Sequence, residues 1–435
     1  MKPKGLIIAV AVLAVLGGLT WWSNKKQASA SKSTDTTTKI LSIPNDQFQE
    51  IRIKKAAQTI DLKGGPGKWQ ITEPQALPAD QDAVSSMVNT LSSLSADTIV
   101  EDKASDLGSY GLTNPSLDVQ ITKKNGKTDN LMIGDDTPTG SGSYAKLAGD
   151  PRVFTLATFN KTNIDKPVDD LRDKKLLTFD SGKLTRIALD AKGMALEFGK
   201  NNDGEWQILK PRPWRADGSQ VDSLVNNLKD AKMDLSEDPK TAATDFAGAM
   251  KVATATVTGP GVNQTLEVRK KGDNYFAKSS AVAVIYKVSA DTGKNLDKGL
   301  DDFRNKKVFD FGFSDPSAMT IQGTAYTKSG DKWMSGGKTM DNTSVQSVID
   351  KLRDLAATKF AETGGGATVF SADVTSNNGK RVEKVTITKQ GDQYFAKREN
   401  EPGIYVLDGK SVDDLQKAAS GIKEAAPAPA PAKKK

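Results

Sequence analysis

The sequence of 435 residues contains no cysteine and no histidine. Without cysteine, disulfide bonds, thiolate metal sites and lipoprotein anchoring through an N-terminal cysteine are excluded. Without histidine, the commonest general base, the serine–histidine–aspartate triad and imidazole-based zinc sites are excluded. Any catalysis would therefore need carboxylates, lysine, tyrosine or a serine–lysine pair.

The body of the chain is also nearly neutral. The formal charge of the whole sequence is +7, but nine of its 61 basic residues and one of its 54 acidic residues lie outside residues 40–432. That stretch has a net charge of −1, so the two ends carry the basic excess. Nucleic-acid binding normally needs a basic face on the folded part, and we predict no nucleic-acid partner. The length suits about three domains of ordinary size.

Residues 1–22 are predicted to form a signal anchor with one transmembrane helix. The run 5–22 is uncharged, and 18 helical residues span about 27 Å, close to the thickness of a bilayer core. Trp21–Trp22 followed by Lys25–Lys26 suits the membrane–water interface. The alternative is a signal peptide cleaved after Ala30. We expect a single-pass protein of the cytoplasmic (inner) membrane, held through residues 5–22, whose C-terminal body lies in the periplasm.

Two polar segments flank the body. Residues 23–40 are small and polar and predict a flexible linker with a reach of about 25 Å. Residues 425–435 form an Ala-Pro/Lys tail, for which an extended polyproline conformation is expected. The tail is interpreted as a solvated spacer or as an electrostatic contact with anionic lipid or an envelope polymer, in which each lysine contributes about 1 kcal/mol.

One pattern occurs three times along the body. Trp69, Trp206 and Trp333 each follow a turn rich in Gly, Asp and Lys, and an amphipathic helical pattern begun by an aspartate follows each of them. The aspartates can cap the helices. The aspartates are Asp80, Asp217 and Asp341, and the apolar stripes are Val84, Met87, Val88, Leu91 and Leu94; Val221, Leu224, Val225, Leu228 and Ala231; and Val345, Val348, Ile349, Leu352 and Leu355.

The stretch after each helix repeats as well. Alternating segments such as LDVQIT predict antiparallel strands, and aligned strands carry Tyr144, Tyr275 and Tyr394 before an Ala-Lys pair. The phrases DDLRDKK and DDFRNKK, 132 residues apart, are predicted to close the first two modules as short capped helices. The predicted fold class is α+β: three tandem repeats after an N-terminal transmembrane helix, each an antiparallel sheet or meander with one long amphipathic helix and a short closing helix. The predicted modules are residues 41–181, 182–314 and a shortened 315–424.

Four groups of residues are weighed as sites. Gly64–Lys68 lacks the full phosphate-loop spacing and predicts a turn. Ser335 and Lys338 have the Ser-x-x-Lys spacing, but two glycines between them also favour a turn. The pairs Asp169–Asp170, Asp301–Asp302 and Asp413–Asp414 fit helix capping better than metal binding or acid–base catalysis. The repeated Trp and Tyr residues fit core packing better than sugar stacking. We therefore predict no catalytic, cofactor-binding or metal-binding residue, no cofactor, and no identifiable substrate-binding residue.

One phrase belongs to the first module alone: Tyr110-Gly111-Leu112-Thr113-Asn114-Pro115, followed by LDVQIT, LMIGDDTP, SYAKL and VFTL. Over roughly residues 69–181 the chain resembles a bacterial family of membrane-anchored domains of unknown function, encoded beside gliding-motility-type ABC transporter components. The resemblance implies a non-enzymatic, extracytoplasmic accessory subunit that contacts ABC permease and ATPase subunits. The alternative is an envelope-polymer binding or scaffolding protein independent of a transporter, and an enzyme is the third hypothesis.

Overall fold

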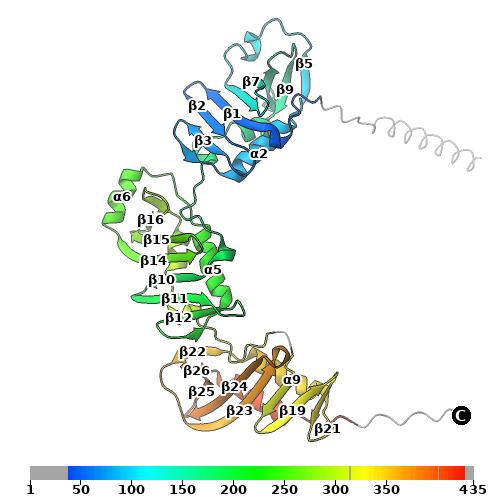
Figure 1. Ribbon diagram of the computed structural model, residues 1–435, viewed down its shortest axis with the longest axis vertical. Helices are drawn as coiled ribbons and strands as arrows, with labels where there is room; N and C mark the ends of the chain where they lie inside the picture. Colours follow the sequence, from blue (N-terminus) through cyan, green and yellow to red (C-terminus); the bar gives the residue numbers. More distant parts are fainter. Residues whose placement is uncertain (1–37, 313–314, 400, 427–435) are drawn as a thin grey trace, which may run out of the picture. The chain divides into compact units, whose positions relative to one another are not determined.

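The computed structural model describes residues 38–312, 315–399 and 401–426 (Figure 1). The anchor predicted at residues 5–22, nearly all of the linker and most of the tail lie outside these residues. Within the described ranges, no helix is long and apolar enough to cross a membrane. Of the described residues, those up to Lys174 form one compact unit and those from Lys175 form a second.

The predicted fold class is wrong, because antiparallel sheet dominates the chain. Strands hold 42% of the residues and helices 24%, in three sheets of nine, eight and nine strands among the described residues. The sequence pattern picked out the long helices but not the many short strands that widen each sheet. Strands as short as β4 (Leu77–Pro78) are too short to show an alternating pattern, and the closing helix α4 (Val168–Leu171) has only four residues.

The first unit contains one sheet of strand order β4-β3-β2-β1-β6-β7-β8-β9-β5. Its other strands are β1 (Phe48–Lys55), β2 (Gln58–Lys63), β3 (Gln70–Glu73), β5 (Thr98–Glu101), β6 (Leu117–Lys123), β7 (Thr128–Asp136), β8 (Gly142–Leu147) and β9 (Val153–Ala157), and its other helices are α2 (Gln81–Ser92) and α3 (Thr158–Ile164). Helix α2 covers one face of this sheet, and the predicted stripe from Val84 to Leu94 is buried there. Asp80 caps α2 by accepting hydrogen bonds from the backbone of Asp82 and Ala83.

A buried ionic group lies within the first sheet. Asp61 on β2 is 1% exposed and accepts hydrogen bonds from Arg52 (3.2 Å) and Thr72 (3.0 Å). Burial alone would raise the pKa of Asp61, but the hydrogen bonds from Arg52 and Thr72 lower that pKa below its ordinary value. The carboxylate is therefore held in its charged form.

The second unit contains two sheets. One has the order β13-β12-β11-β10-β14-β15-β16-β17 and the other β21-β20-β19-β18-β23-β24-β25-β26-β22. The strands of the eight-stranded sheet are β10 (Arg186–Ala191), β11 (Met194–Lys200), β12 (Trp206–Lys210), β13 (Trp214–Arg215), β14 (Met250–Gly259), β15 (Val262–Lys271), β16 (Asn274–Ser279) and β17 (Tyr286–Val288). Those of the nine-stranded sheet are β18 (Ala318–Ile321), β19 (Thr324–Ser329), β20 (Lys332–Ser335), β21 (Lys338–Thr339), β22 (Ala357–Ala361), β23 (Ala367–Ser376), β24 (Arg381–Gln390), β25 (Gln393–Arg398) and β26 (Ile404–Leu407).

Helices of the second unit repeat the scheme of the first. The long helices α5 (Gly218–Lys229) and α9 (Asn342–Asp354) begin at the capping residues Asp217 and Asp341, and both predicted stripes are buried. The remaining helices are α6 (Pro239–Ala247), α7 (Ala290–Leu296), α8 (Leu300–Phe303) and α10 (Gly409–Ser420).

The repeated phrase both closes one module and begins the next. Leu171 packs in the first core, whereas Leu176 and Leu177 pack in the core of the eight-stranded sheet. In the same way Phe303 packs in that core, while Val308 begins the core of the nine-stranded sheet. The backbone N–H of Leu176 donates to Ala231 (2.9 Å), and that of Val308 donates to Leu355 (2.9 Å). Ala231 and Leu355 are the last residues of the apolar stripes that begin on α5 and α9. Each phrase therefore forms a hydrogen bond between the start of a new module and the end of the stripe of that module.

The two sheets of the second unit meet at a buried ionic joint centred on Arg215. Its guanidinium binds Glu401 (2.5 Å), Asp310 (3.1 Å) and the Tyr405 hydroxyl (2.9 Å), and also the carbonyl of Lys307. Beside the joint is a polar cleft of about 800 Å³. Among its lining residues, Arg381 of one sheet pairs with Glu205 beside β12 of the other, and Arg398 pairs with Glu383, so the cleft is part of the joint.

An aromatic clamp continues this joint. The Arg304 guanidinium lies 3.7 Å from the centre of the Trp214 ring and 4.8 Å from that of Phe360. The backbone of Gly403 passes so close to Trp214 that an added Cβ would lie 1.9 Å from the ring. Trp214 belongs to the eight-stranded sheet and Phe360 to its neighbour, so a cation is sandwiched between rings from the two modules.

Candidate functional site

The glycine-rich candidates are turns. Residues Gly64–Lys68 join β2 to β3, with positive φ at Gly64 and Gly67. Ser335 and Lys338 face each other as the last pair of the β20–β21 hairpin. The Ser335 hydroxyl donates to the carbonyl of Ala325 (2.7 Å), and Lys338 pairs with Glu424 (2.5 Å). Neither side chain activates the other.

The aspartate pairs do not share one role. Asp169 and Asp170 lie in the first turn of α4, and Asp302 accepts from the backbone N–H of Gly299 (2.7 Å) at the start of α8. The third pair lies inside α10, whose cap is Asp408. Asp413 accepts a hydrogen bond there from the Tyr394 hydroxyl (3.2 Å). The capping interpretation therefore holds for Asp302 alone: α4 has no side-chain cap hydrogen bond, and Asp413–Asp414 do not cap α10.

The repeated aromatic residues do not all have the same environment either. Trp69, Trp206 and Trp333 are buried in the three cores, and so are Tyr275 and Tyr394. Tyr144 is different. Ala145 points into the first core, and successive side chains of a strand point to opposite faces, so Tyr144 lies on the outer face of the sheet. It is half-buried there against Tyr110, with 4.9 Å between the ring centres and an angle of 60° between the rings.

The phrase that begins at Tyr110 builds this aromatic pair. Gly111 ends a single helical turn with φ +65°, and an added Cβ would meet the Asp135 carboxylate at 2.5 Å. At Gly134 on β7, a Cβ would lie 2.1 Å from the carbonyl oxygen of Tyr110. Two glycines therefore let the loop approach the outer face of the sheet closely at β7, and the buried Leu112 anchors the loop.

In the other two modules, a connecting segment covers the side chain at the position that corresponds to Tyr144. In the eight-stranded sheet, Phe276 follows Tyr275 on the outer face and is fully buried under Phe246 of α6. In the nine-stranded sheet, Phe395 is covered by the loop at Gly364, where an added Cβ would lie 2.7 Å from the ring. The first module alone leaves two half-exposed tyrosines here. The pair Tyr110–Tyr144, with the loop 101–111 and Asp135, is named the aromatic patch below.

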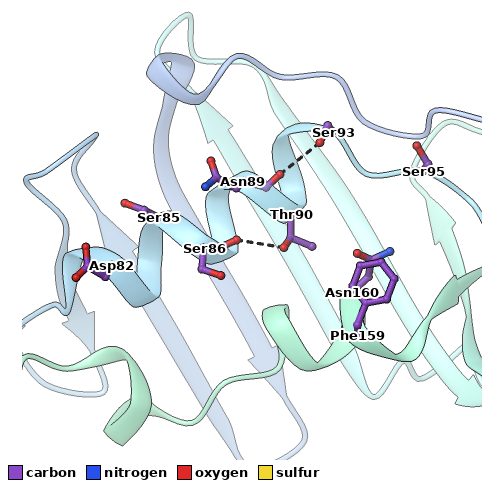
Figure 2. A pocket seen from close by; sticks show the side chains of 9 residues that line it. All are labelled: Asp82, Ser85, Ser86, Asn89, Thr90, Ser93, Ser95, Phe159 and Asn160. Atoms are coloured by element: carbon purple, nitrogen blue, oxygen red, sulfur yellow. Dashed lines mark hydrogen bonds between the residues drawn. The ribbon is translucent and has the colours of Figure 1, made fainter.

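A second surface of the first unit is a groove between α2 and α3, of about 650 Å³ (Figure 2). Polar side chains along α2 line one side, and Phe159 and Asn160 of α3 line the other. Phe159 is 66% exposed, unusually high for a phenylalanine. The lining residues are Asp82, Ser85, Ser86, Asn89, Thr90, Ser93, Ser95, Phe159 and Asn160.

The outer face of α2 is almost without charge. Asp82 is the only charged residue of α2, whereas α5 contains Asp222 and Lys229 and α9 contains four charged residues. Because the three helices are built on one pattern, this difference is a property of the surface and not of the fold. Depletion of charge with one exposed aromatic ring is typical of the centre of a protein interface.

A family model matches two stretches of the chain, residues 69–213 and 206–378, and each match begins at one of the repeated tryptophans. The chain belongs to the family described as domain of unknown function (DUF4340). The resemblance drawn from the Tyr110–Pro115 phrase is thus confirmed as far as a domain of unknown function. No curated protein and no solved structure matches the chain.

In this DUF4340 chain, the groove and the aromatic patch offer groups that can bind a partner. The groove offers hydroxyl and amide groups with one ring, and the patch offers two phenols beside carboxylates. Within the described residues, no group of three or more acidic side chains is arranged to hold a metal ion. Sequence reasoning missed both surfaces; the signal for the groove was the uncharged run Ala83–Ala96, and the signal for the patch was YAK in place of YFAK.

Proposed function

We propose that this DUF4340 chain is a non-enzymatic accessory subunit of an ABC transport system, held at the cytoplasmic membrane by its N-terminal segment with its body on the extracytoplasmic side. The α2–α3 groove, whose lining carries one charged residue, Asp82, and the exposed Phe159, is the observation that carries the proposal. Its occupant is a helix of the extracytoplasmic part of the permease. The location and the transporter come from the sequence and its resemblance, and the groove gives the proposal a surface.

The chemistry of the groove supports a helix as its occupant. Ser85, Ser86 and Asn89 are short, and small side chains let the backbones of two helices approach closely. Phe159 supplies the large ring that such an interface needs as an anchor. Burying about 150–250 Å² of an aromatic side chain contributes several kcal/mol at about 25 cal/mol per Å². The surrounding hydroxyls can satisfy polar groups of the partner at little desolvation cost.

Affinity purification from native membranes tests the proposal. The full-length tagged chain is crosslinked briefly and purified in mild detergent, and the ABC permease and ATPase subunits are quantified by mass spectrometry. Phe159→Ala and Ser93→Lys should each lower their recovery at least five-fold. Met250→Ala is the matched control, because Met250 is an apolar residue 76% exposed in the second unit; it should leave recovery unchanged. Equal recovery with all three variants, or no transporter subunit at all, contradicts the proposal.

A second function is favoured by the same lining. Eight of the nine lining residues carry a polar side chain beside the exposed ring, and hydroxyl and amide groups with a stacking ring also suit a neutral envelope polysaccharide. In that case the chain is an envelope-polymer binding or scaffolding protein. Co-sedimentation with isolated envelope polymer that is lost in Phe159→Ala, without transporter subunits in the purification, would select this function.

A further inference from the structure

The aromatic patch is a part of the sheet face that the fold leaves only half covered. Its rings Tyr110 and Tyr144 are half-buried, whereas the corresponding ring Phe276 is fully buried. Among the described residues, no lysine or arginine lies over either tyrosine ring, although cations lie over aromatic rings at several other places in the chain. Lys146, which follows Tyr144 on the same face of β8, is engaged with the carbonyl of Asp150. The two tyrosine rings therefore remain open to a partner.

Carboxylates surround the two rings. The loop 101–111 contains three acidic residues and one lysine, and the Asp135 carboxylate lies against the end of that loop. Within the described ranges, Glu101, Asp106 and Asp135 are exposed, and none of them forms a salt bridge. Burial raises the pKa of Tyr110, and the nearby Glu101 carboxylate raises it further. The patch is therefore anionic, and charge complementarity fits it to a cationic group of a partner.

The second unit shows which cation such a set of groups holds. In the ionic joint, the Arg215 guanidinium donates to the Tyr405 hydroxyl (2.9 Å) and pairs with Glu401 (2.5 Å), and its central carbon lies 6.0 Å from the centre of the Tyr405 ring. Arg304 is held in the same way between the two rings of the aromatic clamp. Arginine suits these positions because its planar guanidinium stacks on a ring while its N–H groups bind carboxylates. The ammonium of lysine is a strongly hydrated point charge and stacks less well.

We propose that the aromatic patch is a docking site for an arginine of a partner protein, whose guanidinium lies against Tyr110 and Tyr144 and beside the three carboxylates. Contact with the rings distinguishes arginine from lysine, whereas the carboxylates attract any cation. That attraction depends on salt, because exposed charges are screened beyond about 10 Å at 0.1 M salt. The site does not depend on the α2–α3 groove, since α2 packs on the opposite face of the first sheet.

Binding of two matched peptides to the full-length protein in neutral detergent tests the proposal. One probe is a fluorescein-labelled peptide of alternating arginine and serine, and the other has lysine in place of each arginine, so that the two carry equal charge. Fluorescence anisotropy gives both dissociation constants. The arginine peptide should bind about five-fold more tightly, because stacking of a guanidinium on exposed rings contributes about that factor. Equal dissociation constants would overturn the proposal, since they would leave only general attraction between charges.

Substitutions at the rings locate the preference for arginine. Tyr144→Phe keeps both rings and should keep the preference, whereas Tyr144→Ser should lower the ratio of the two dissociation constants to about two or less. An unchanged circular dichroism spectrum shows that the variant is folded; if the spectrum changes, Tyr110→Ser in the exposed loop gives the same comparison. A preference for arginine that persists in the serine variants would overturn the proposal.

Substitutions of carboxylates locate the attraction between charges. Glu101→Gln should weaken the binding of both peptides about three-fold, because it removes one exposed charge beside the rings. Asp46→Asn is the matched control: Asp46 is an exposed carboxylate before β1, outside the patch, and its loss should leave both dissociation constants unchanged. Equal effects of the two substitutions would show that the peptides bind elsewhere on the chain and would overturn the proposal.

Discussion

Replacement of Arg215 by alanine should loosen the junction between the two sheets of the second unit. The Arg215 side chain is 16% exposed and Glu401 is 10% exposed, so the pair is largely removed from water. Without the guanidinium, Glu401, Asp310 and the Tyr405 hydroxyl lose their shared donor. Removal of one partner from a buried ion pair costs about 3–5 kcal/mol when the remaining charge is left unpaired. Arg398 still lies 3.3 Å from Glu401, so the loss should be about 3 kcal/mol, at the lower end of that range.

The assay is urea unfolding followed segment by segment by pulsed hydrogen exchange. For an m-value of about 3 kcal/mol per M, the midpoint of the second unit should fall by about 1 M. Arg212→Ala is the control: Arg212 lies three residues away and pairs with Glu362, but the two side chains are 54% and 72% exposed. An exposed pair contributes about 0–1 kcal/mol. If both variants shift the midpoint equally, burial of the Arg215 network is not what stabilises the junction.

Three further perturbations test other parts of the structure. Because the pKa of Asp61 is lowered in the folded state, the charged carboxylate stabilises the first unit fully above about pH 4, and this stabilisation is lost as the pH falls through the lowered pKa. In Asp61→Asn, the free energy of unfolding of the first unit should therefore fall less steeply with decreasing pH. An unchanged slope would refute this. Gly403→Ala, with its Cβ 1.9 Å from the Trp214 ring, should lower the melting temperature by many degrees, whereas Gly365→Ala, with no atom within 4 Å, should not. Asp341→Ala removes the cap of α9 and should cost about 1 kcal/mol in urea unfolding; no cost would mean that water replaces the cap.

The long helices could be predicted because their information is local. An aspartate and five apolar residues at helical spacing lie within 15 residues, and all fifteen stripe positions are buried, although the last one of each stripe lies just beyond the end of α2, α5 or α9. The strands around Trp69, Trp206 and Trp333 carry similar local information. The number of strands in each sheet is not encoded locally. Strands of two to five residues at the edges of each sheet are fixed by pairing with their neighbours and not by their own sequence pattern.

The two candidate surfaces and the junction depend on contacts that no local pattern encodes. Tyr144 occupies the outer face because its module has YAK where the others have YFAK, and one residue fewer moves a strand's side chains to the opposite face. Arg215 meets Glu401 across 186 residues of chain. Phe159 stands out only once the exposure of its ring is known.

The repeated phrase contains both the last core residue of one module and the first core residues of the next. This overlap determines how a copy of a module can be inserted or removed. A duplicated stretch from residue 175 to residue 306 carries its own Leu176–Leu177 and its own closing Phe303, and its length equals the 132-residue interval between the two phrases. Insertion of such a stretch leaves no apolar segment unpaired at either junction. A stretch that began after Leu177 but still ended at residue 306 would lack the two leucines of its own core. Gene duplication within this family should therefore favour stretches of the full 132-residue interval.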